Sequence, residues 1–152
     1  GEMGISASPE DIIITHSLGS CIGVTMYDPR ACIGGLVHCM LPLSRNDPAK
    51  AARNPCLYVD TGVAALLRTV LERGAVKKRL VVKVAGGARM MDHEDHFRTH
   101  EKNYYITRKI LWKNNLLIAA EQVGGENTPR TLTLYMEDGR TTVLTRRVTC
   151  EL

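Results

Sequence analysis

Residues 21–38 read CIGVTMYDPRACIGGLVH, and this stretch decides how the chain folds. Apolar residues alternate with Gly, Thr and Tyr over residues 22–27, a period of two that indicates a β-strand. Asp28-Pro29-Arg30 is typical of a turn, after which the chain returns as a second strand that ends at His38. Because a hairpin brings its two open ends together, the sequence predicts that Cys21 and His38 lie close in space.

Two helices are predicted beyond this hairpin. Apolar residues recur at helical spacing from Val59 to Leu71, with Asp60 placed as an N-cap and Gly74 placed to end the helix. A second helix is predicted over residues 104–113, with Asn103 as its cap. Both helices have polar residues at their ends, so each is expected to be a separate element between strands.

Strands outnumber helices in the rest of the sequence. Asp138-Gly139 is a strong turn signal between two of them. No repeat, linker or low-complexity segment interrupts the 152 residues. The predicted fold class is therefore α+β: a single-domain sandwich over residues 1–152, in which mixed, hairpin-rich β-sheets pack with helices. Further strands are expected over residues 12–15, 80–85, 116–121, 131–136 and 142–148, and loops over residues 43–57 and 91–102.

Composition narrows the class of protein and its partners. No apolar run reaches the roughly 18 residues of a membrane-spanning helix, so the chain is expected not to insert into a membrane. The net charge is +4, but Lys and Arg are scattered and only 5% of residues are aromatic, which argues against a nucleic-acid-binding surface. Five cysteines without a Cys-x-x-Cys pair favour a reducing compartment, and the cytoplasm is the expected location. The sequence starts at Gly1, so a few native residues are expected to precede it.

Cys21 and His38 are the minimum set for a thiol nucleophile and its general base. Gly19 and Ser20 allow a tight turn before the cysteine, and the amide of Cys21 with the amide or hydroxyl of Ser20 is placed to bind an oxyanion. Thr15, on the strand that leads into the turn, carries a hydroxyl that can orient the imidazole. The alternative is that both residues only pack, because free cysteine is among the most buried residue types.

The charge state of the pair depends on what surrounds the cysteine. A strand rather than a helix follows Cys21, so no helix dipole is available to stabilise a thiolate. We therefore expect His38 to lower the pKa of the thiol. An ion pair of this kind predicts that Cys21 reacts with iodoacetamide below pH 7, where an ordinary thiol with a pKa of about 8.5 is protonated.

Other candidate residues compete with this pair. Cys39 points to the opposite strand face from the base and is expected in the core, while His16 is ranked second as a base. His93, His96 and His100 would share one face of a helix, a set that suits zinc or nickel. That segment lacks helical periodicity and is expected to be a solvated loop, so no metal is assigned.

The motif Leu18-Gly19-Ser20-Cys21, followed by His38-x-Met40-Leu41-Pro42, resembles the CheD family of chemoreceptor glutamine deamidases. The likeness continues through Gly86-Gly87, Asn103 and Gly124-Gly125, and so covers nearly the whole chain in the expected order. On their own, the two glycine pairs indicate backbone turns rather than phosphate-binding loops. The cysteine and histidine motifs together are therefore what makes the resemblance specific.

This resemblance implies that Cys21 is the nucleophile, His38 the base and Thr15 its orienting residue, in a fold similar to that of toxin-type Cys–His deamidases. Family members hydrolyse selected glutamine side chains on the cytoplasmic helices of methyl-accepting chemoreceptors to glutamate, through a thioester and as part of chemotaxis adaptation. No cofactor is implied, and a CheC-type phosphatase is an expected partner. Two alternatives remain: a non-enzymatic module that regulates such a phosphatase or a receptor, and a Cys–His hydrolase of another class, such as a methylesterase or transamidase.

Overall fold

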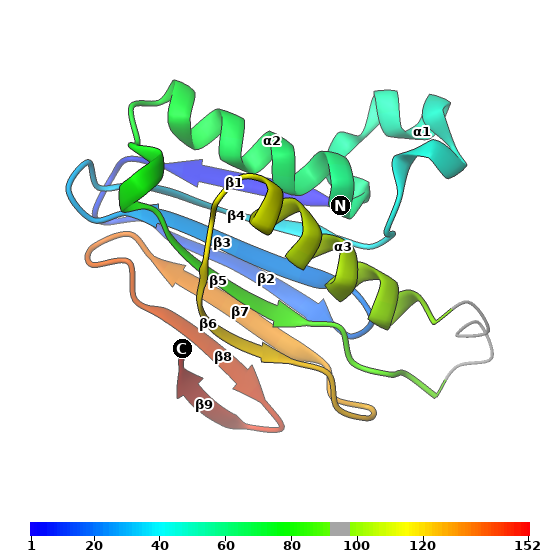
Figure 1. Cartoon of the computed structure of the whole chain (residues 1–152). Coiled ribbons are helices and arrows are strands. Elements are labelled where there is room, and N and C mark those ends of the chain that lie inside the picture. The colour runs from blue at the N-terminus through cyan, green and yellow to red at the C-terminus, as the bar shows by residue number, and fades with distance from the viewer. Residues whose placement is uncertain (92–97) are drawn as a thin grey trace.

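The computed structural model describes residues 1–91 and 98–152 (Figure 1). The helices are α1 (Pro48–Arg53), α2 (Val59–Glu72) and α3 (Thr99–Lys113), with single 3₁₀ turns at Ser44–Asn46, Pro55–Leu57 and Lys77–Arg79. The strands are β1 (Glu2–Ser6), β2 (Ile12–Leu18), β3 (Ile22–Asp28), β4 (Ile33–Cys39), β5 (Val81–Gly86), β6 (Ile118–Val123), β7 (Arg130–Tyr135), β8 (Thr141–Thr145) and β9 (Val148–Glu151).

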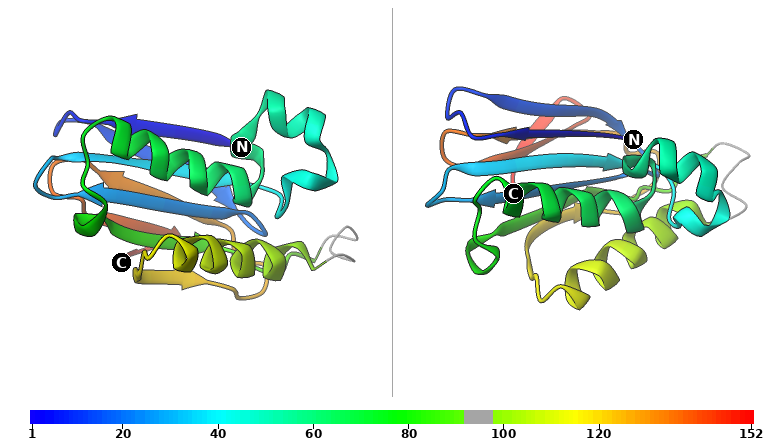
Figure 2. Two further views of the ribbon diagram at one scale, coloured as in Figure 1. Left: turned by 45° about the horizontal axis from the view of Figure 1, so that its top comes forward. Right: turned by 90° about the horizontal axis from the view of Figure 1, so that it is seen from above.

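These elements form three layers. Five strands make one sheet in the order β1-β4-β3-β5-β6, and four make a second sheet in the order β2-β7-β8-β9. Helices α2 and α3 cover one face of the five-stranded sheet, and the four-stranded sheet packs on the other (Figure 2). The larger sheet is mixed, because β5 and β6 run parallel while β3 and β4 run antiparallel. The predicted α+β sandwich of mixed sheets and helices is thus confirmed. None of the helices in the described ranges is long and apolar enough to cross a membrane.

Strand β3 lies at the centre of the larger sheet and is buried along its whole length. Val24 and Met26 belong to the core beneath the helices, whereas Tyr27 packs on Leu134 of the second sheet. At Gly23, a Cβ atom would come within 2.8 Å of the Leu18 side chain, so the missing side chain lets the sheets approach. Alternate side chains of β3 therefore point into two different cores, one beneath the helices and one between the two sheets, and neither face of the strand is exposed to solvent.

Helix α2 confirms the first predicted helix but begins differently. The N-cap is Tyr58, and Asp60 lies in the first turn, where its carboxylate accepts hydrogen bonds from the Ser44 amide at 2.9 Å and the Ser44 hydroxyl at 2.8 Å. Asp60 therefore ties the preceding segment to the helix instead of capping it. Gly74 follows the C-cap with a φ of 110°, which favours glycine, so the predicted stop is confirmed.

Two regions predicted as loops contain helical residues. Within residues 43–57, α1 forms because Pro48 starts it and the Asp47 carboxylate accepts a hydrogen bond from the Lys50 amide at 3.0 Å. Helix α3 begins at Thr99, one turn before the predicted start, so Asn103 is a buried residue inside the helix rather than its cap.

Two further strands depart from the sequence prediction. Strand β1 is a short strand at the edge of the larger sheet, where it pairs with β4, and was not predicted. Residues 142–148 are divided between β8 and β9 by Arg146 and Arg147, which have φ values of 48° and 69°. Turns with positive φ usually contain Gly or Asn, so two arginines give no turn signal in the sequence.

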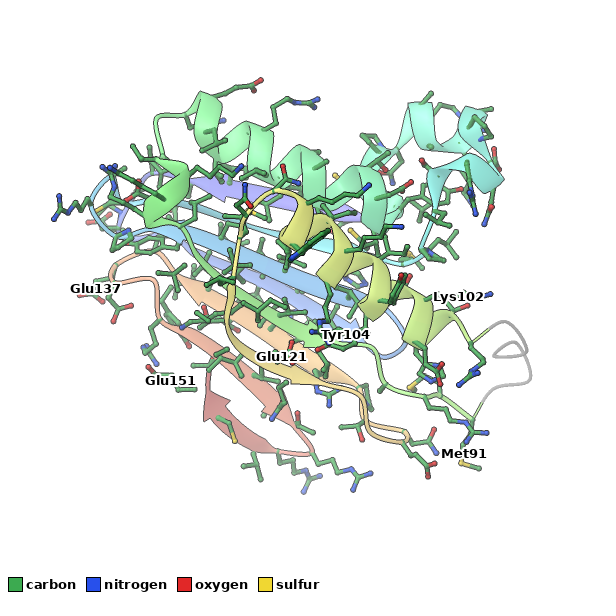
Figure 3. All side chains as sticks on the ribbon, viewed as in Figure 1. Met91, Lys102, Tyr104, Glu121, Glu137 and Glu151 are labelled. Atoms are coloured by element: carbon green, nitrogen blue, oxygen red, sulfur yellow. The ribbon has the colours of Figure 1, made fainter. Side chains whose placement is uncertain are left out.

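Polar contacts attach the outer elements to the sheets. The Tyr104 hydroxyl of α3 donates a 2.7 Å hydrogen bond to the Glu121 carboxylate of β6 (Figure 3). Between the two sheets, the Lys83 ammonium of β5 donates a hydrogen bond to the carbonyl of Leu152 at 2.8 Å. The helix layer and the C-terminal strand are thus both anchored to the larger sheet.

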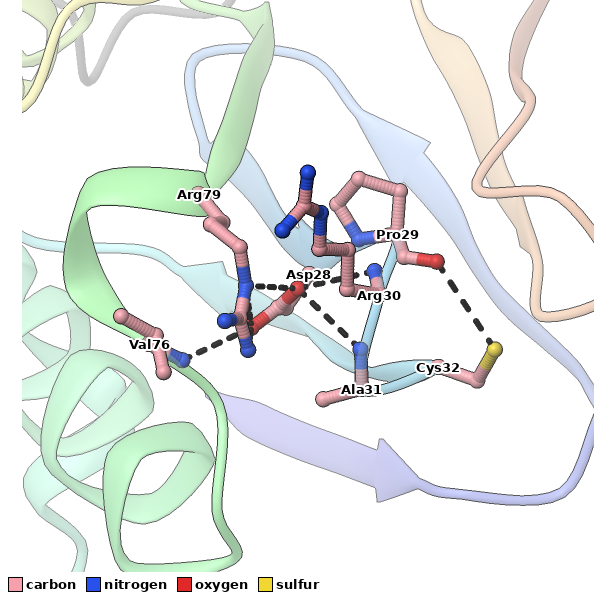
Figure 4. A network of polar contacts seen from close by, with 7 residues as sticks. All are labelled: Asp28, Pro29, Arg30, Ala31, Cys32, Val76 and Arg79. Atoms are coloured by element: carbon pink, nitrogen blue, oxygen red, sulfur yellow. Dashed lines mark hydrogen bonds and ion pairs between the residues drawn. The ribbon is translucent and has the colours of Figure 1, made fainter.

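A buried carboxylate fixes the closed end of the β3–β4 hairpin (Figure 4). Asp28 has no exposed surface and accepts hydrogen bonds from the Arg79 guanidinium at 2.8 and 2.9 Å and from the Val76 amide at 2.7 Å. The amides of Arg30 and Ala31 donate to the same carboxylate. The bonds from Arg79, above all, hold the pKa of Asp28 well below its ordinary value. The turn is thereby locked to the segment that leads into β5.

Candidate active site

The open end of the same hairpin places two predicted site residues on one face of the sheet. Gly23 pairs with His38 in the ladder, and Cys21 lies two residues before Gly23. Cys21 packs on a cluster that includes Leu18 of the second sheet and Leu36 of β4. Because side chains alternate along a strand, Cys21 and His38 both face the space between the sheets.

Thr15 reaches His38 from the opposite sheet. Its Oγ1 lies 2.8 Å from Nδ1 of the imidazole, so the hydrogen bond expected from the sequence is present. Nε2 of His38 is buried and has no hydrogen-bond partner among the described residues. The next residue, His16, is exposed and lies with Nδ1 3.2 Å from the Thr131 hydroxyl. Strand alternation therefore turns His16 away from the pair and removes it as the second candidate base.

Backbone contacts hold the turn that carries Cys21. The Gly87 amide donates to the Cys21 carbonyl and the Ala88 amide to the Gly19 carbonyl, both at 2.8 Å. Gly86 has a φ of 114°, and a Cβ atom there would collide with the Cys21 carbonyl oxygen. Glycine is thus required at Gly86 for both reasons, and the glycine pair acts as a backbone turn, as predicted.

The candidate oxyanion site lies at this turn. Within the part of the chain that the structure describes, the amides of Ser20 and Cys21 donate no hydrogen bond to another residue. Gly19, the residue before Ser20, has no side chain to crowd these amides. A Cβ atom there would lie 3.0 Å from the Met90 sulfur, so the space is tight for a larger residue. These two adjacent amides are therefore the candidates to stabilise an oxyanion, and the Cys21 amide also faces its own sulfur.

Burial sets the charge state of the pair. It raises the pKa of the Cys21 thiol and lowers the pKa of the His38 imidazole. At neutral pH the pair is therefore a thiol and a neutral imidazole. The expectation that His38 lowers the thiol pKa is wrong, because loss of water raises the pKa of Cys21 by more than the groups around it lower it.

A hollow of about 180 Å³ opens beside the imidazole. Cys21 is not among the residues that line it, so the hollow approaches the pair from the side of His38 and Thr15. The lining residues come from β1, β2 and β4: Glu2, Met3, Gly4, Ile13, Ile14, Thr15, Leu36 and His38.

The remaining candidates lie away from this arrangement. Cys39 is fully buried in the core beneath the helices, as predicted, and burial raises its pKa. All five cysteines are free thiols. His100 lies in the first turn of α3, with Nε2 3.7 Å from the Glu101 carboxylate, whereas His93 and His96 lie outside the described residues. Among the residues that the structure does describe, no group of three metal-ligating side chains is assembled.

Comparison with known proteins decides the family. Residues 40–145 match the family model described as CheD chemotactic sensory transduction. The chain belongs to the CheD family. A relative from Solibacter usitatus (strain Ellin6076), named "Probable chemoreceptor glutamine deamidase CheD", is 47% identical over 136 residues, which cover 90% of this chain and 80% of the relative. "Probable chemoreceptor glutamine deamidase CheD 1" from Syntrophus aciditrophicus (strain SB) is 44% identical over 136 residues, 90% of this chain and 84% of that protein.

The CheD match begins at residue 40, so Thr15, Cys21 and His38 all precede it. Membership of the CheD family therefore does not by itself assign roles to these three side chains. Their roles rest on the position of Cys21 and His38 on one sheet face and on the bond between Thr15 and His38.

Asn103 lies beside the candidate site in a position that sequence reasoning missed. Its side-chain Nδ2 donates to the Ser20 carbonyl at 2.9 Å and to the Met40 carbonyl at 3.0 Å. The available signal was the place of Asn103 in the family resemblance. Its polar character suggested a helix cap, because the sequence does not show that α3 starts one turn earlier.

Proposed function

We propose that this CheD protein is a chemoreceptor glutamine deamidase that acts in the cytoplasm as one domain over residues 1–152. It hydrolyses selected glutamine side chains on the cytoplasmic helices of methyl-accepting chemoreceptors. One observation carries this proposal: Thr15 occupies Nδ1 of His38 and leaves the buried Nε2 as the nitrogen that can act as a base. The names of the relatives support the substrate class.

His38 acts first as a general base in the proposed reaction. For Nε2 to accept a proton, Nδ1 carries the hydrogen and donates it to the Thr15 hydroxyl oxygen. The lowered pKa of His38 keeps Nε2 unprotonated at neutral pH. Nε2 takes the proton of the Cys21 thiol while sulfur bonds to the carboxamide carbon, and the carbonyl electron pair moves onto oxygen.

The tetrahedral intermediate then collapses to a thioester. The amides of Cys21 and Ser20 stabilise its oxyanion. As the carbonyl re-forms, the C–N bond breaks and protonated His38 gives its proton to the departing nitrogen, which leaves as ammonia. His38 takes a proton from water as the water oxygen bonds to the thioester carbon. The C–S bond then breaks, His38 returns the proton to sulfur, and glutamate and the free thiol are released. Each turnover adds one negative charge to the receptor, which biases the packing of its helices.

A CheC-type phosphatase is the second proposed partner. Its support is the family resemblance alone, since some members of the CheD family bind such a phosphatase. Size-exclusion chromatography of the two purified proteins tests this proposal directly, and separate elution at micromolar concentrations would contradict it.

The deamidase proposal is tested with the cytoplasmic domain of the cognate chemoreceptor. After incubation, peptide mass spectrometry should find specific glutamines converted to glutamate by the wild-type protein and none by Cys21→Ala. Binding of the receptor without conversion would instead identify a regulatory module. Hydrolysis of glutamyl methyl esters, or incorporation of an added amine, with glutamine amides left intact, would identify a Cys–His enzyme of another class.

A further inference from the structure

Asn103 connects two backbone segments that carry the proposed nucleophile and base. Its side chain has no exposed surface, and Nδ2 donates one hydrogen to the carbonyl of Ser20 and the other to the carbonyl of Met40. Ser20 directly precedes Cys21, and Met40 follows His38 by two residues. A single amide group from α3 thus holds both sides of the open hairpin end.

The hairpin ladder does not extend to these residues. The last pair between β3 and β4 at this end is Ile22 with Cys39, so Ser20 and Met40 lie beyond it. In the described parts of the chain, their carbonyls accept hydrogen bonds from Asn103 alone. The side chain of Asn103 therefore connects the two strands beyond the end of their ladder, next to Cys21.

This arrangement leaves one polar atom unsatisfied. Both partners are carbonyl oxygens, which only accept, so the NH₂ group of Asn103 must face them. Its Oδ1 is then buried without a partner, and among the described residues it shares that condition only with Nε2 of His38. An unpaired buried acceptor destabilises a fold, so such groups in native proteins call for a functional explanation.

We propose that Asn103 is a positioning residue for deamidation, which sets the separation and orientation of Cys21 and His38; this inference rests on the proposed function. The described hydrogen bonds of its side chain go to backbone carbonyls next to the pair, so the role argued here is exerted through Cys21 and His38. Its effect arises because small errors in the placement of a nucleophile relative to its base are amplified in the rate.

Two substitutions at Asn103 and one matched control test the proposal. Asn103→Leu keeps the volume and removes both donors, while Asn103→Gln keeps the donors on a longer stem. Thr107→Val is the control, because Thr107 is equally buried one turn further along α3, and its hydroxyl donates to the Asn103 carbonyl at 2.8 Å. At the same folded fraction, kcat should fall roughly 10- to 100-fold in the leucine variant and less in the glutamine variant, with KM within about twofold of wild type.

Thr107→Val should keep kcat within about twofold of wild type, although it also loses a buried hydrogen bond. The proposal is overturned if Asn103→Leu and Thr107→Val have equal kcat values. If the leucine variant does not fold, the glutamine variant decides instead: a wild-type kcat in that variant would likewise overturn the positioning role.

A double-mutant cycle without substrate separates this inference from the proposed function. Alkylation of Cys21 by iodoacetamide is measured with and without His38→Ala, in the wild-type and Asn103→Leu backgrounds. At pH 7 the neutral imidazole can take the thiol proton as the sulfur is alkylated, so His38→Ala should slow alkylation about tenfold in the first background. In the second background the effect should be less than about threefold, because residues that act as a unit are not additive. Equal effects in both backgrounds would overturn the positioning role. The effect of His38→Ala on alkylation could depend on Asn103 in a protein that converts no receptor glutamine. That result would support the positioning role and overturn the deamidase function.

Discussion

The two ends of the β3–β4 hairpin differ in the charge and the hydrogen bonding of their buried polar groups. At the closed end, Asp28 is fully buried, and five protein donors, Arg79 foremost, hold it as a carboxylate. At the open end, burial keeps Cys21 and His38 uncharged, and Nε2 of His38 has no described partner.

This difference separates a structural anchor from a reactive site. A charge whose hydrogen bonds are all made is stable where it is and has no capacity left for a ligand. A neutral thiol and imidazole with an unused nitrogen are held in place by neighbours but keep their capacity for proton transfer. Substitutions at the Asp28 end should therefore change stability alone, and those at the Cys21 end should change the rate.

The largest effect is expected from Cys21→Ala. Removal of the nucleophile should lower kcat for deamidation by on the order of 10⁴-fold or more, because the oxyanion site alone supplies little catalysis. The fold should persist, since Cys21 is only half-buried. Cys39→Ala is the control: it should keep the wild-type rate and lose roughly 1 kcal/mol in the free energy of unfolding, as a small core truncation does. Mass spectrometry and urea unfolding measure the two quantities, and wild-type turnover by Cys21→Ala would end the proposed mechanism.

Asp28→Ala should produce the largest loss of stability. It leaves the Arg79 guanidinium and three backbone amides, those of Arg30, Ala31 and Val76, without their acceptor, a change that costs about 3–5 kcal/mol for a buried pair. Because the pKa of Asp28 is lowered in the folded state, the difference in urea midpoint between wild type and variant should be complete above its ordinary value of 3.8 and shrink as the pH falls below it. The rate per folded molecule should not change, and a lower rate at equal stability would refute the contrast between the two ends.

Thr15 substitutions should have an intermediate effect. The bond to Nδ1 of His38 is a neutral hydrogen bond worth about 0.5–1.5 kcal/mol, so Thr15→Val, which keeps the shape, should slow kcat roughly tenfold. Thr15→Ser keeps the hydroxyl and should recover most of the rate. Equal rates for the two variants would show that Thr15 only packs and that another contact orients the imidazole.

The smallest effect concerns pH. The lowered pKa of His38 and the raised pKa of Cys21 predict that kcat/KM stays level from below pH 6.5 to above pH 9.0, the ordinary values of the two groups. In the free protein, a pH titration of the Cys21 thiol should therefore have its midpoint above pH 9.0. A midpoint below pH 7 would instead indicate a thiolate–imidazolium pair.

Sequence alone determined the features that depend on neighbouring residues. Alternation over residues 22–27 reveals β3, and the turn at residues 28–30 brings Cys21 and His38 to one hairpin end. Gly74 marks the end of α2 because few other residues adopt its positive φ. The same alternation places Cys39 in the core. These results follow from local geometry, in which the spacing of residues along the chain fixes the direction of each side chain.

Only the tertiary structure decided what lies around these residues. The sequence shows neither that Arg79 closes on Asp28 nor that Asn103, far along the chain, donates to the carbonyls of Ser20 and Met40. It also led to the wrong sign for the Cys21 pKa, because that sign depends on how much water the folded chain removes. Burial and contacts between distant segments arise only when the two sheets and the helix layer pack together, so no local pattern encodes them.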